Sequence, residues 1–432
     1  MKNICFYFQV HIPYILRRYR FFEIGKDHYY YDDFNSENNV RYYADYSFLP
    51  ANKIIMDLIR ETNGGFKCAF SICGTTLEQL EQYAPEVIDS FRELAETGCV
   101  EFLAEPYSNS LASIYNDNEF EIQVKAHAQK IQELFGKKPK VFRNSELIYS
   151  DEIGEKISKL GYNVILAEGA KHVLGWKSPN YVYKHAYLPK VKLLVRNFVM
   201  SNHIPFDFSN TSWDQYPLTA DKYMQWIADS PEGENLFNIW LGYESFGCTQ
   251  KGYTGIFEFL KAIPSQAAQR GIGFVTPSEA AKTDAVDSLT ALHPLSWSGE
   301  AKDLSSWTGN HLQEEALNKL YSVAERVNLC SEKALKHDWL AIQDTNYMRY
   351  MSFSDAWGSQ YGSPYEAFIN YMNILSDFLM RVDAEYPTSI ENEELNALLN
   401  TINDQDKTIA ELEKTIKQLR SRKSKNADKT QE

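Results

Sequence analysis

The amino-acid sequence predicts an α/β fold with a barrel of parallel strands. Over roughly the first 280 residues, short apolar runs alternate with amphipathic segments of helical periodicity. Strands that alternate with helices build a parallel sheet, and seven or eight such units favour closure into a barrel. The predicted strands are Ile4–Val10, Phe66–Ile72, Cys99–Leu103, Lys140–Phe142, Asn163–Ala167, Leu193–Phe198, Leu236–Leu241 and Ile272–Val275.

The helices between these strands are marked at their ends. One amphipathic segment has Pro85 near its start and Gly98 just past its end, where these residue types are common. Each of the next two segments also stops at a glycine. They are Val124–Phe135, followed by Gly136, and Ile153–Leu160, followed by Gly161.

The remainder of the chain is predicted to be helical in two different ways. Leu312–Val327 and Tyr365–Val382 have the apolar periodicity of helices that pack on a barrel. From Leu395 to Leu419, apolar residues step by three and four with one interruption at Gln405, as in a short coiled coil. We expect a barrel domain over 1–284, a helical domain over 285–387, and a coiled-coil segment with a polar tail over 388–432. The coiled coil predicts self-association; a helix folded back on its own chain is the alternative.

The charge balance excludes several kinds of partner. The chain has 58 acidic and 44 basic residues, which gives a formal net charge of −14. Nucleic acids and anionic membranes bind clustered Lys and Arg, so neither is expected as a partner. A neutral polysaccharide imposes no such demand. The aromatic content of 14% fits rings that stack on sugars as well as a large core.

The cysteines and the start of the chain predict a cytoplasmic protein. None of the six cysteines forms a Cys-x-x-Cys pair, which indicates small buried side chains in a reducing compartment. Polar Gln9 and His11 interrupt the first apolar run, which we interpret as a strand rather than a signal peptide. No apolar run is long enough to span a membrane.

Several catalytic classes lack their motifs. The sequence has no His-Glu-x-x-His, and its nine histidines lack the spacing of metal ligands, so no metal is expected. It also has no phosphate-binding glycine loop and no Gly-x-Ser-x-Gly elbow of a serine hydrolase.

Polar side chains follow several predicted strands at the end where a barrel places its chemistry. They are His11, Glu105, the run from Arg143 to Glu146, and Glu244. Glu146 is the best candidate, because Arg143 beside it could hold its carboxylate in the ionised form. Glycosidic hydrolysis needs two carboxyl groups, one to attack or assist and one to donate a proton. A structural salt bridge is the alternative role for a glutamate in this place.

Five segments of the sequence share motifs with a known family. They are FQVHIPYILRRYRFF near the start, TGCVEFLAEPYSNSLASI at 97–114, FRNSELIYSDEIG at 142–154, LGYESFG at 241–247 and TPSEA at 276–280. Through them the chain resembles the α-amylase branch of glycoside hydrolase family 57 over roughly residues 1–385. The resemblance implies a distorted (β/α)₇ barrel with a helical C-terminal domain. It also implies a retaining mechanism on α-glucans without metal or organic cofactor, with Glu146 as the nucleophile.

The most important departure from the family pattern lies at Gly242. Relatives have an aspartate as proton donor in a segment like Asp-Tyr-Glu-Thr-Phe-Gly, whereas this chain has Gly242 at the start of that segment. Glycine has no side chain that could donate a proton. Loss of a general acid costs roughly two to four powers of ten in rate. Glu244 points the same way as Gly242 in a strand and is a possible substitute acid, or else a residue of the cleft wall.

Further departures surround the same site. Asn109 stands where relatives have a histidine, and Ile12 replaces an amide residue of the first motif. The pairs Asn202–His203 and Thr345–Asn346 stand where relatives have an acidic pair and an Asp-His pair. Together these changes indicate relaxed selection on catalysis.

Three interpretations follow. In the first, the chain binds α-1,4-glucans and at most weakly cleaves them. In the second, it is a working retaining α-amylase or glucanotransferase that uses Glu146 with a substitute acid such as Glu244. In the third, it is a scaffold that no longer binds sugar. The residues expected to bind a maltooligosaccharide are His11, Glu105, Arg143, Trp213 and Trp240, and simple burial is the alternative for the tryptophans.

Overall fold

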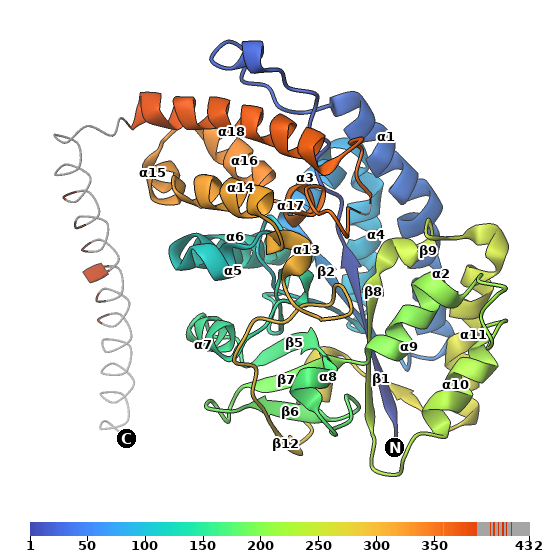
Figure 1. Ribbon diagram of the computed structural model, residues 1–432. Helices are drawn as coiled ribbons and strands as arrows, with labels where there is room; N and C mark the ends of the chain where they lie inside the picture. The colour runs from blue at the N-terminus through green and yellow to red at the C-terminus, as the bar shows by residue number, and fades with distance from the viewer. Residues whose placement is uncertain are drawn as a thin grey trace, which may run out of the picture. The chain divides into compact units, whose positions relative to one another are not determined.

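The computed structural model describes residues 1–356 and 358–386, together with residues 398, 401, 405, 408, 409, 412 and 416. The chain divides into two compact units, Met1–Phe378 and Leu379–Glu432. The first unit contains every strand in the described part of the chain (Figure 1). Most of the predicted coiled-coil segment over 388–432 lies outside the described residues, and the predicted domain borders stay predictions.

The first sheet is parallel and is centred on β1 (Asn3–Val10). β1 pairs with β8 (Leu236–Gly242) along almost its whole length. It also pairs with β11 (Gly273–Phe274) near its start and with β2 (Cys68–Ile72) over its second half. β2 in turn pairs with β3 (Val100–Phe102). The carboxyl ends of β1, β2, β3 and β8 therefore lie at the same edge of the sheet.

The second sheet has the order β12-β6-β7-β5-β4, and its one antiparallel pair is β6 with β7. Each of the eight predicted strands overlaps an observed strand, whereas β6 and β12 were not predicted. The bounds are β4 Phe142–Arg143, β5 Val164–Glu168, β6 Val182–His185, β7 Lys192–Arg196 and β12 Asp287–Leu289.

Backbone contacts join the two sheets at two places. Ala104, just after β3, forms a parallel bridge with Phe142 of β4. On the other side, the backbone N–H of Asn197, just after β7, donates to the carbonyl of Asn238 in β8 at 2.9 Å. The strands β1 to β5, β7 and β8 are thus linked one to the next.

The alternation of side chains along β1 produces two distinct cores. Phe6, Phe8 and Val10 belong to a large apolar cluster that also includes residues of the surrounding helices. Cys5 and Tyr7 point the opposite way, into a smaller cluster between the two sheets. The same alternation places the polar side chains of the inner face near the site described below.

The three helices predicted around the sheets are present as α4, α6 and α7, although α6 begins at Asp117, well before the predicted Val124. Asn116 caps α6 by accepting from Glu119 N at 2.9 Å, and α6 ends at Gly136, which has a left-handed conformation with φ 76°. A π-helix, Ala44–Phe48, joins α1 to α2 without a break. The bounds are α1 Asp33–Tyr43, α2 Leu49–Glu61, α3 Gly74–Tyr83, α4 Pro85–Glu96, α5 Ala112–Tyr115, α6 Asp117–Phe135, α7 Asp151–Lys159, α8 Lys171–Leu174, α9 Phe198–Asn202, α10 Ala220–Ala228, α11 Ile256–Gln269 and α12 Pro277–Ala280.

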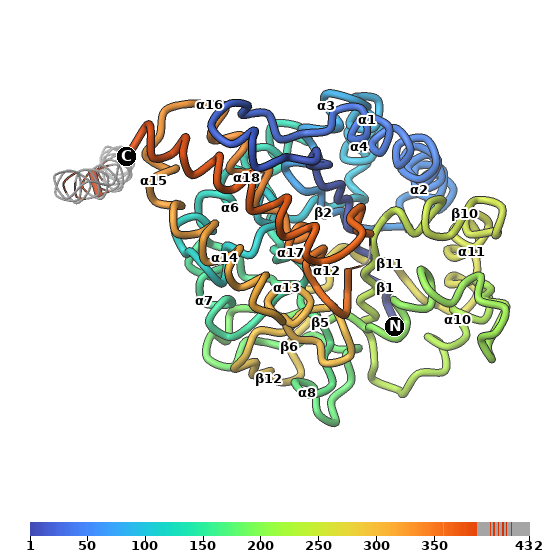
Figure 2. The backbone as a smooth tube through the Cα atoms, turned by 45° about the horizontal axis from the view of Figure 1, so that its top comes forward, coloured from blue at the N-terminus to red at the C-terminus, as the bar shows by residue number. Residues whose placement is uncertain are grey.

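The C-terminal part of the described chain is helical, as predicted (Figure 2). The single helix predicted over Leu312–Val327 is wrong in detail, because α14 ends at Tyr321 and a new helix begins at Ala324. The apolar periodicity continues through the turn since both helices bury their apolar residues. The bounds are α13 Ser305–Thr308, α14 His311–Tyr321, α15 Ala324–Leu329, α16 Lys333–Ile342, α17 Thr345–Arg349 and α18 Pro364–Glu385.

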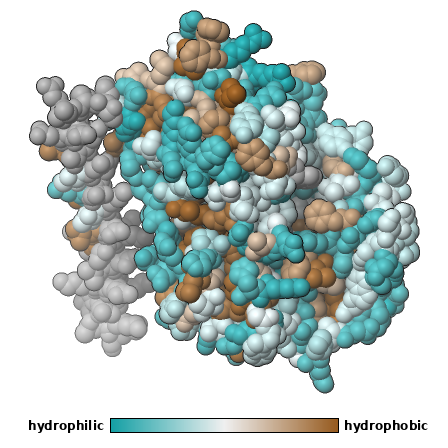
Figure 3. Space-filling model, viewed as in Figure 1, coloured by the Kyte–Doolittle hydropathy of each residue, from teal (hydrophilic) through white to brown (hydrophobic). Residues whose placement is uncertain are grey.

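The described helices include none with the length and apolar character needed to cross a membrane. The face seen in Figure 3 is mostly hydrophilic, with hydrophobic residues scattered or recessed in hollows. This surface is compatible with the high negative charge of the sequence.

Candidate active site

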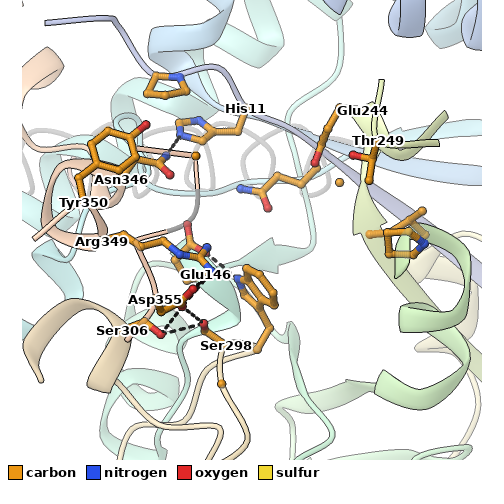
Figure 4. Close-up of a pocket in the computed structure, with 18 of the residues that line it drawn as sticks. His11, Glu146, Glu244, Thr249, Ser298, Ser306, Asn346, Arg349, Tyr350 and Asp355 are labelled. Carbon is orange, nitrogen blue, oxygen red and sulfur yellow. Dashed lines mark hydrogen bonds and ion pairs between the residues drawn. The ribbon is translucent and has the colours of Figure 1, made fainter. Parts of the chain in front are cut away.

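A pocket of about 950 Å³ lies at the carboxyl ends of the parallel strands. His11 follows β1, Glu146 follows β4, and Glu244 follows β8, and all three line the pocket. The helical C-terminal part contributes further lining residues, among them Trp297 and Arg349. In Figure 4, Glu146 lies near Arg349 and Asp355 on one side of the pocket, and Glu244 lies near Thr249 on another.

Both carboxylate oxygens of Glu146 accept hydrogen bonds. Asn109 donates through Nδ2 to Oε1 at 2.8 Å, and Thr345 donates through its hydroxyl to the same oxygen at 3.0 Å. Trp297 donates through its indole N–H to Oε2 at 2.6 Å. Three donors from three separate segments therefore fix the direction of this carboxylate.

The surroundings of Glu146 favour its ionised form. Burial alone would raise the pKa of Glu146, but the charge of Arg143 and the bonds from Trp297 and Asn109 outweigh burial. The net effect lowers the pKa below the usual range of a glutamate. Glu146 is therefore a charged carboxylate over most of the pH range, as a nucleophile must be.

The backbone at Glu146 is held in an unusual conformation. Glu146, Leu147 and the donor Asn109 all have left-handed backbones, with φ of 54°, 54° and 50°. Side chains other than glycine adopt this region at a cost of order 1–3 kcal/mol each, and such residues cluster at functional sites. The strain points to Glu146 as the centre of the site on grounds independent of the sequence motifs.

Arg143 and Glu105 lie behind Glu146 and not in the pocket wall. Both side chains are completely buried, and Arg143 Nη1 donates to Glu105 Oε2. His127 lies 3.8 Å from the other oxygen of Glu105, and burial lowers the pKa of this histidine. Arg143 supplies positive charge near Glu146 from within the core, and Glu105 holds Arg143 in place. This geometry supports a role for both residues in positioning Glu146.

A second ion pair supports Trp297. The Arg349 guanidinium lies over the Trp297 ring at 5.2 Å, and its Nη2 donates to Asp355 at 2.9 Å. Ser298 and Ser306 donate to the same carboxylate, at 2.9 and 2.7 Å. These bonds hold Arg349 against the indole of Trp297, and Figure 4 shows Arg349, Asp355, Ser298 and Ser306 together beside Glu146.

The pKa of Glu244 is shifted in the opposite direction from that of Glu146. Burial raises its pKa to about 7, while the nearby His11 acts to lower it and only partly offsets burial. Glu244 is thus protonated to a large extent at neutral pH. A carboxyl group with its pKa near the working pH is suited to donate and accept protons.

The carboxyl group of Glu244 fills the space left by the missing side chain of residue 242. A Cβ placed on Gly242 would lie 2.1 Å from Glu244 Oε1 and 2.5 Å from Oε2, far inside contact distance. The strand β8 ends at Gly242, and the 3-10 turn Tyr243–Ser245 brings the longer side chain back over it.

His11 is a charged member of the pocket wall. Its Nε2 lies 2.9 Å from Asp344 Oδ2, and Asn346 approaches the same nitrogen at 3.0 Å. Burial alone would lower the pKa of His11, but the carboxylate of Asp344 outweighs it and raises the pKa above the usual range. His11 therefore faces the pocket as a cation.

The two tryptophans expected to bind sugar lie in different places. Trp240 lines the pocket, with its ring centre 5.7 Å from that of Trp297. Trp213 does not line the pocket, and its ring packs 4.7 Å from that of His203. Sequence reasoning did not identify Trp297 or Arg349, because no strand end or motif precedes them. Thr345 was noted only as a departure, although it donates to Glu146.

The described residues contain no group of three or more His, Cys, Asp or Glu side chains arranged to hold a metal ion. Two cationic side chains of the pocket wall are paired with carboxylates of the protein, the first being Arg349 with Asp355. Arg196, also in the wall, is paired with the buried Glu168 at 2.9 Å.

The parallel strands, the strained glutamate and the second carboxyl group define an α/β protein that holds two carboxyl groups with opposite pKa shifts in one pocket. The sequence profile of the family described as "Glycosyl hydrolase family 57" matches residues 5–292, which include Glu146, Gly242 and Glu244. The chain belongs to glycosyl hydrolase family 57.

Known proteins agree with this assignment. A relative from Methanocaldococcus jannaschii, named "Putative alpha-amylase", is 35% identical over 400 residues, which cover 87% of this chain and 84% of that protein. A family 57 branching enzyme from Thermococcus kodakaraensis has the same fold, with a TM-score of 0.66, 14% identity and coverage of 91% of this chain and 94% of that one. A family 57 branching enzyme from Pyrococcus horikoshii gives a TM-score of 0.64 at 15% identity, over 94% and 95% of the two chains. At such identities the structures establish the fold alone.

Proposed function

We propose that this protein is a retaining enzyme that cleaves α-1,4-glucosidic bonds, with Glu146 as nucleophile and Glu244 as proton donor. The observation that carries the proposal is the position of the Glu244 carboxyl group over Gly242, together with a pKa of about 7. The sequence alone favoured a binder without a proton donor, because residue 242 is glycine. The geometry favours the second interpretation, in which a neighbouring glutamate replaces the missing acid.

The proposed reaction follows from the two protonation states. The Glu146 carboxylate attacks the anomeric carbon of a glucosyl unit, and the bond from that carbon to the leaving oxygen breaks. Glu244 gives its proton to the leaving oxygen and becomes a carboxylate. The Glu244 carboxylate then takes a proton from a water molecule or a sugar hydroxyl group. The oxygen of that acceptor attacks the anomeric carbon, and the bond between this carbon and Glu146 breaks. The acceptor in this second step decides between hydrolysis and glucanotransfer.

The pocket composition supports a neutral sugar substrate. Trp240 and Trp297 line the pocket together with Glu146, and the ionic side chains Arg196 and Arg349 are neutralised by carboxylates within the protein. A neutral maltooligosaccharide supplies hydroxyl groups to the polar side chains and carbon faces to the rings.

Three finer features belong to the same proposal. The contacts between β3 and β4 and between β7 and β8 support a distorted (β/α)₇ barrel. All six cysteines are free and buried, which supports a reducing, cytoplasmic location. The heptad pattern of residues 388–432 supports self-association through a coiled coil.

The proposal is tested by turnover and binding together. Purified protein is incubated with maltoheptaose while product formation and heat of binding are measured, for the wild type, Glu146→Gln and Glu244→Gln. The proposal expects turnover in the wild type, loss in both variants, and binding in all three. Binding without turnover in the wild type would return the chain to the non-catalytic interpretation. If the wild type neither binds nor cleaves maltoheptaose, the scaffold interpretation is favoured.

A further inference from the structure

The surface beside the pocket carries an exposed aromatic group. Tyr42 lies in the last turn of the helix α1, Tyr46 lies in the π-helix that follows, and Tyr253 lies in the turn after β10 (Gln250–Lys251). Their exposed fractions are 37% for Tyr42, 60% for Tyr46 and 91% for Tyr253. We call these three residues the tyrosine platform. Single exposed aromatic side chains are common on protein surfaces, whereas several gathered in one region mark a binding surface more often.

Two rings of the platform, those of Tyr42 and Tyr46, are held in place by the protein. Tyr42 and Tyr46 lie side by side, with ring centres 5.0 Å apart and planes at 38°. The Lys251 ammonium donates to the Tyr42 hydroxyl and lies 5.2 Å from the centre of that ring. Tyr42 is thus covered by its neighbours, and it supports Tyr46, which keeps most of its surface free. A preorganised ring loses little entropy when a ligand stacks on it.

The platform is continuous with the candidate active site. Tyr43, which adjoins Tyr42, lines the pocket, and so does Thr249 from the segment that leads to Lys251. The backbone carbonyl of Tyr46 packs directly on Gly247, where a Cβ would lie 1.8 Å from that oxygen. Gly247 has φ 107° and pairs with Lys251 across β9 (Phe246–Gly247) and β10. The segment that supplies Glu244 therefore continues directly into the platform.

One short segment, formed by the end of α1 and the π-helix after it, contributes residues both to the pocket and to the tyrosine platform. Tyr42 and Tyr46 are four residues apart, so they lie on the same side of the helix. Tyr43 lines the pocket, and its ring packs edge-on against that of Tyr42 with ring centres 5.8 Å apart. A π-helix adds a residue to the helical turn and commonly marks a functional site. Here it begins at Ala44, directly after Tyr43, and carries Tyr46.

We propose that the tyrosine platform binds an extended α-glucan chain that runs out of the pocket. A pyranose ring has faces of C–H groups that pack on an aromatic ring, and hydroxyl groups that bond to Tyr253 and Lys251. The inference rests on the proposed function for the class of ligand, and it adds that the substrate is a long or branched chain. Short maltooligosaccharides fill the pocket and do not reach the platform.

The test measures polymer binding separately from pocket binding. The variant Tyr46→Ala/Tyr253→Ala removes the two open rings and leaves Tyr42, Tyr43 and the pocket intact. The matched control is Tyr187→Ala, which removes a ring of similar exposure (64%) from the connection between β6 and β7. Affinity electrophoresis in native gels that contain glycogen gives the dissociation constant for the polymer. Calorimetry gives that for maltotriose, and light scattering gives the oligomeric state.

The expected result is a dissociation constant for glycogen about tenfold weaker in the double variant, which corresponds to about 1.4 kcal/mol. The control and the wild type bind glycogen equally, and maltotriose binds all three proteins equally. Unchanged glycogen binding in the double variant would overturn the inference, and so would a wild type that does not bind glycogen. A changed oligomeric state would overturn it in favour of an interface between copies of the chain.

These outcomes are separate from those of the proposed function. Loss of glycogen binding in the double variant of a protein that cleaves nothing would support the platform and contradict the proposed catalysis. If the wild type cleaves maltoheptaose and the double variant binds glycogen as tightly as the wild type, the proposed catalysis is supported and the platform is contradicted.

Discussion

The carboxyl group of Glu244 occupies the place where the side chain of residue 242 would begin, since a Cβ on Gly242 would lie 2.1 Å from Glu244 Oε1. The two residues are neighbours in space because β8 ends at Gly242 and a 3-10 turn follows at once. The glycine that removes one acid therefore makes room for another. The proposed function rests on this relationship, because it assigns to Glu244 the role of the proton donor that residue 242 lacks.

Gly242→Ala should lower kcat on maltooligosaccharides by about a hundredfold or more, the usual contribution of a general acid. The added methyl group displaces the flexible end of Glu244 without removing any functional group. Steady-state kinetics of Gly242→Ala, Glu244→Gln and the double variant test this reason. If Gly242 acts only through Glu244, the double variant is no worse than Glu244→Gln. Additive losses, or a large drop in melting temperature, would show that the alanine acts in another way.

The rate should decline above pH 7. Glu244 must be protonated to act as an acid, and its pKa is about 7, so each further pH unit removes about nine-tenths of the active form. Glu146 stays ionised throughout, because its pKa is lowered, and the acidic limb lies below the usual range of a glutamate. The profile of kcat/KM against pH measures both limbs. A flat profile between pH 6 and 9 would show that Glu244 is not the acid.

Trp297→Phe should raise the pKa of Glu146. The variant keeps an aromatic ring between Trp240 and Arg349 but removes the donor that lies 2.6 Å from Glu146 Oε2. A hydrogen bond to a charged group is worth about 1.5–3 kcal/mol, so we expect kcat to fall about ten- to a hundredfold. The acidic limb of the profile moves to higher pH at the same time.

Trp240→Phe is the matched control for this shift. The indole N–H of Trp240 makes no hydrogen bond within the described residues, so its removal leaves the acidic limb in place. Equal shifts in the two variants would show that ring packing, and not the bond to Glu146, sets the pKa.

Arg143→Met should destabilise the fold by about 3–5 kcal/mol, the usual cost of leaving one partner of a buried ion pair alone. Its partner Glu105 is completely buried and would lose its charged neighbour. Chemical denaturation measures the change in the free energy of unfolding. Arg60→Met, an exposed position on α2, serves as the control and should change that free energy by less than about 0.5 kcal/mol. If Arg143→Met changes the free energy of unfolding as little as the control does, the ion pair of Arg143 and Glu105 contributes little to stability.

The strands were predictable because each is a short apolar run between turn residues. Four strands were missed: β9 and β10 have only two residues each, and β6 and β12 lack a continuous apolar run. β6 contains Lys184 and is not a continuous apolar run, and β12 is an edge strand of three residues with one buried side chain. The turn between α14 and α15 was missed because apolar periodicity continues across it. Periodicity reports which side chains are buried, and it does not register a change in helix direction.

Glu146 and Glu244 were predictable as candidates because both follow strands of one parallel sheet. Their different chemistry was not, because it depends on neighbours distant in sequence. Glu146 takes its donors from Asn109, Trp297 and Thr345, and Thr345 lies 199 positions away. Asn109 and Thr345 were interpreted as signs of lost function, whereas in the structure both stabilise the carboxylate. The effect of such substitutions on the carboxylate cannot be predicted from the sequence, because it depends on contacts that only the structure gives.

The central claim is that Glu244 protonates the leaving group, and leaving-group dependence tests it most directly. Glu244→Gln is assayed on maltoheptaose, whose leaving oxygen needs a proton, and on 4-nitrophenyl α-maltoside, whose nitrophenolate leaves without one. The account predicts that kcat/KM falls about a hundred- to ten-thousandfold on maltoheptaose and less than about tenfold on the nitrophenyl substrate. Equal losses on both substrates, or full activity on maltoheptaose, would contradict it.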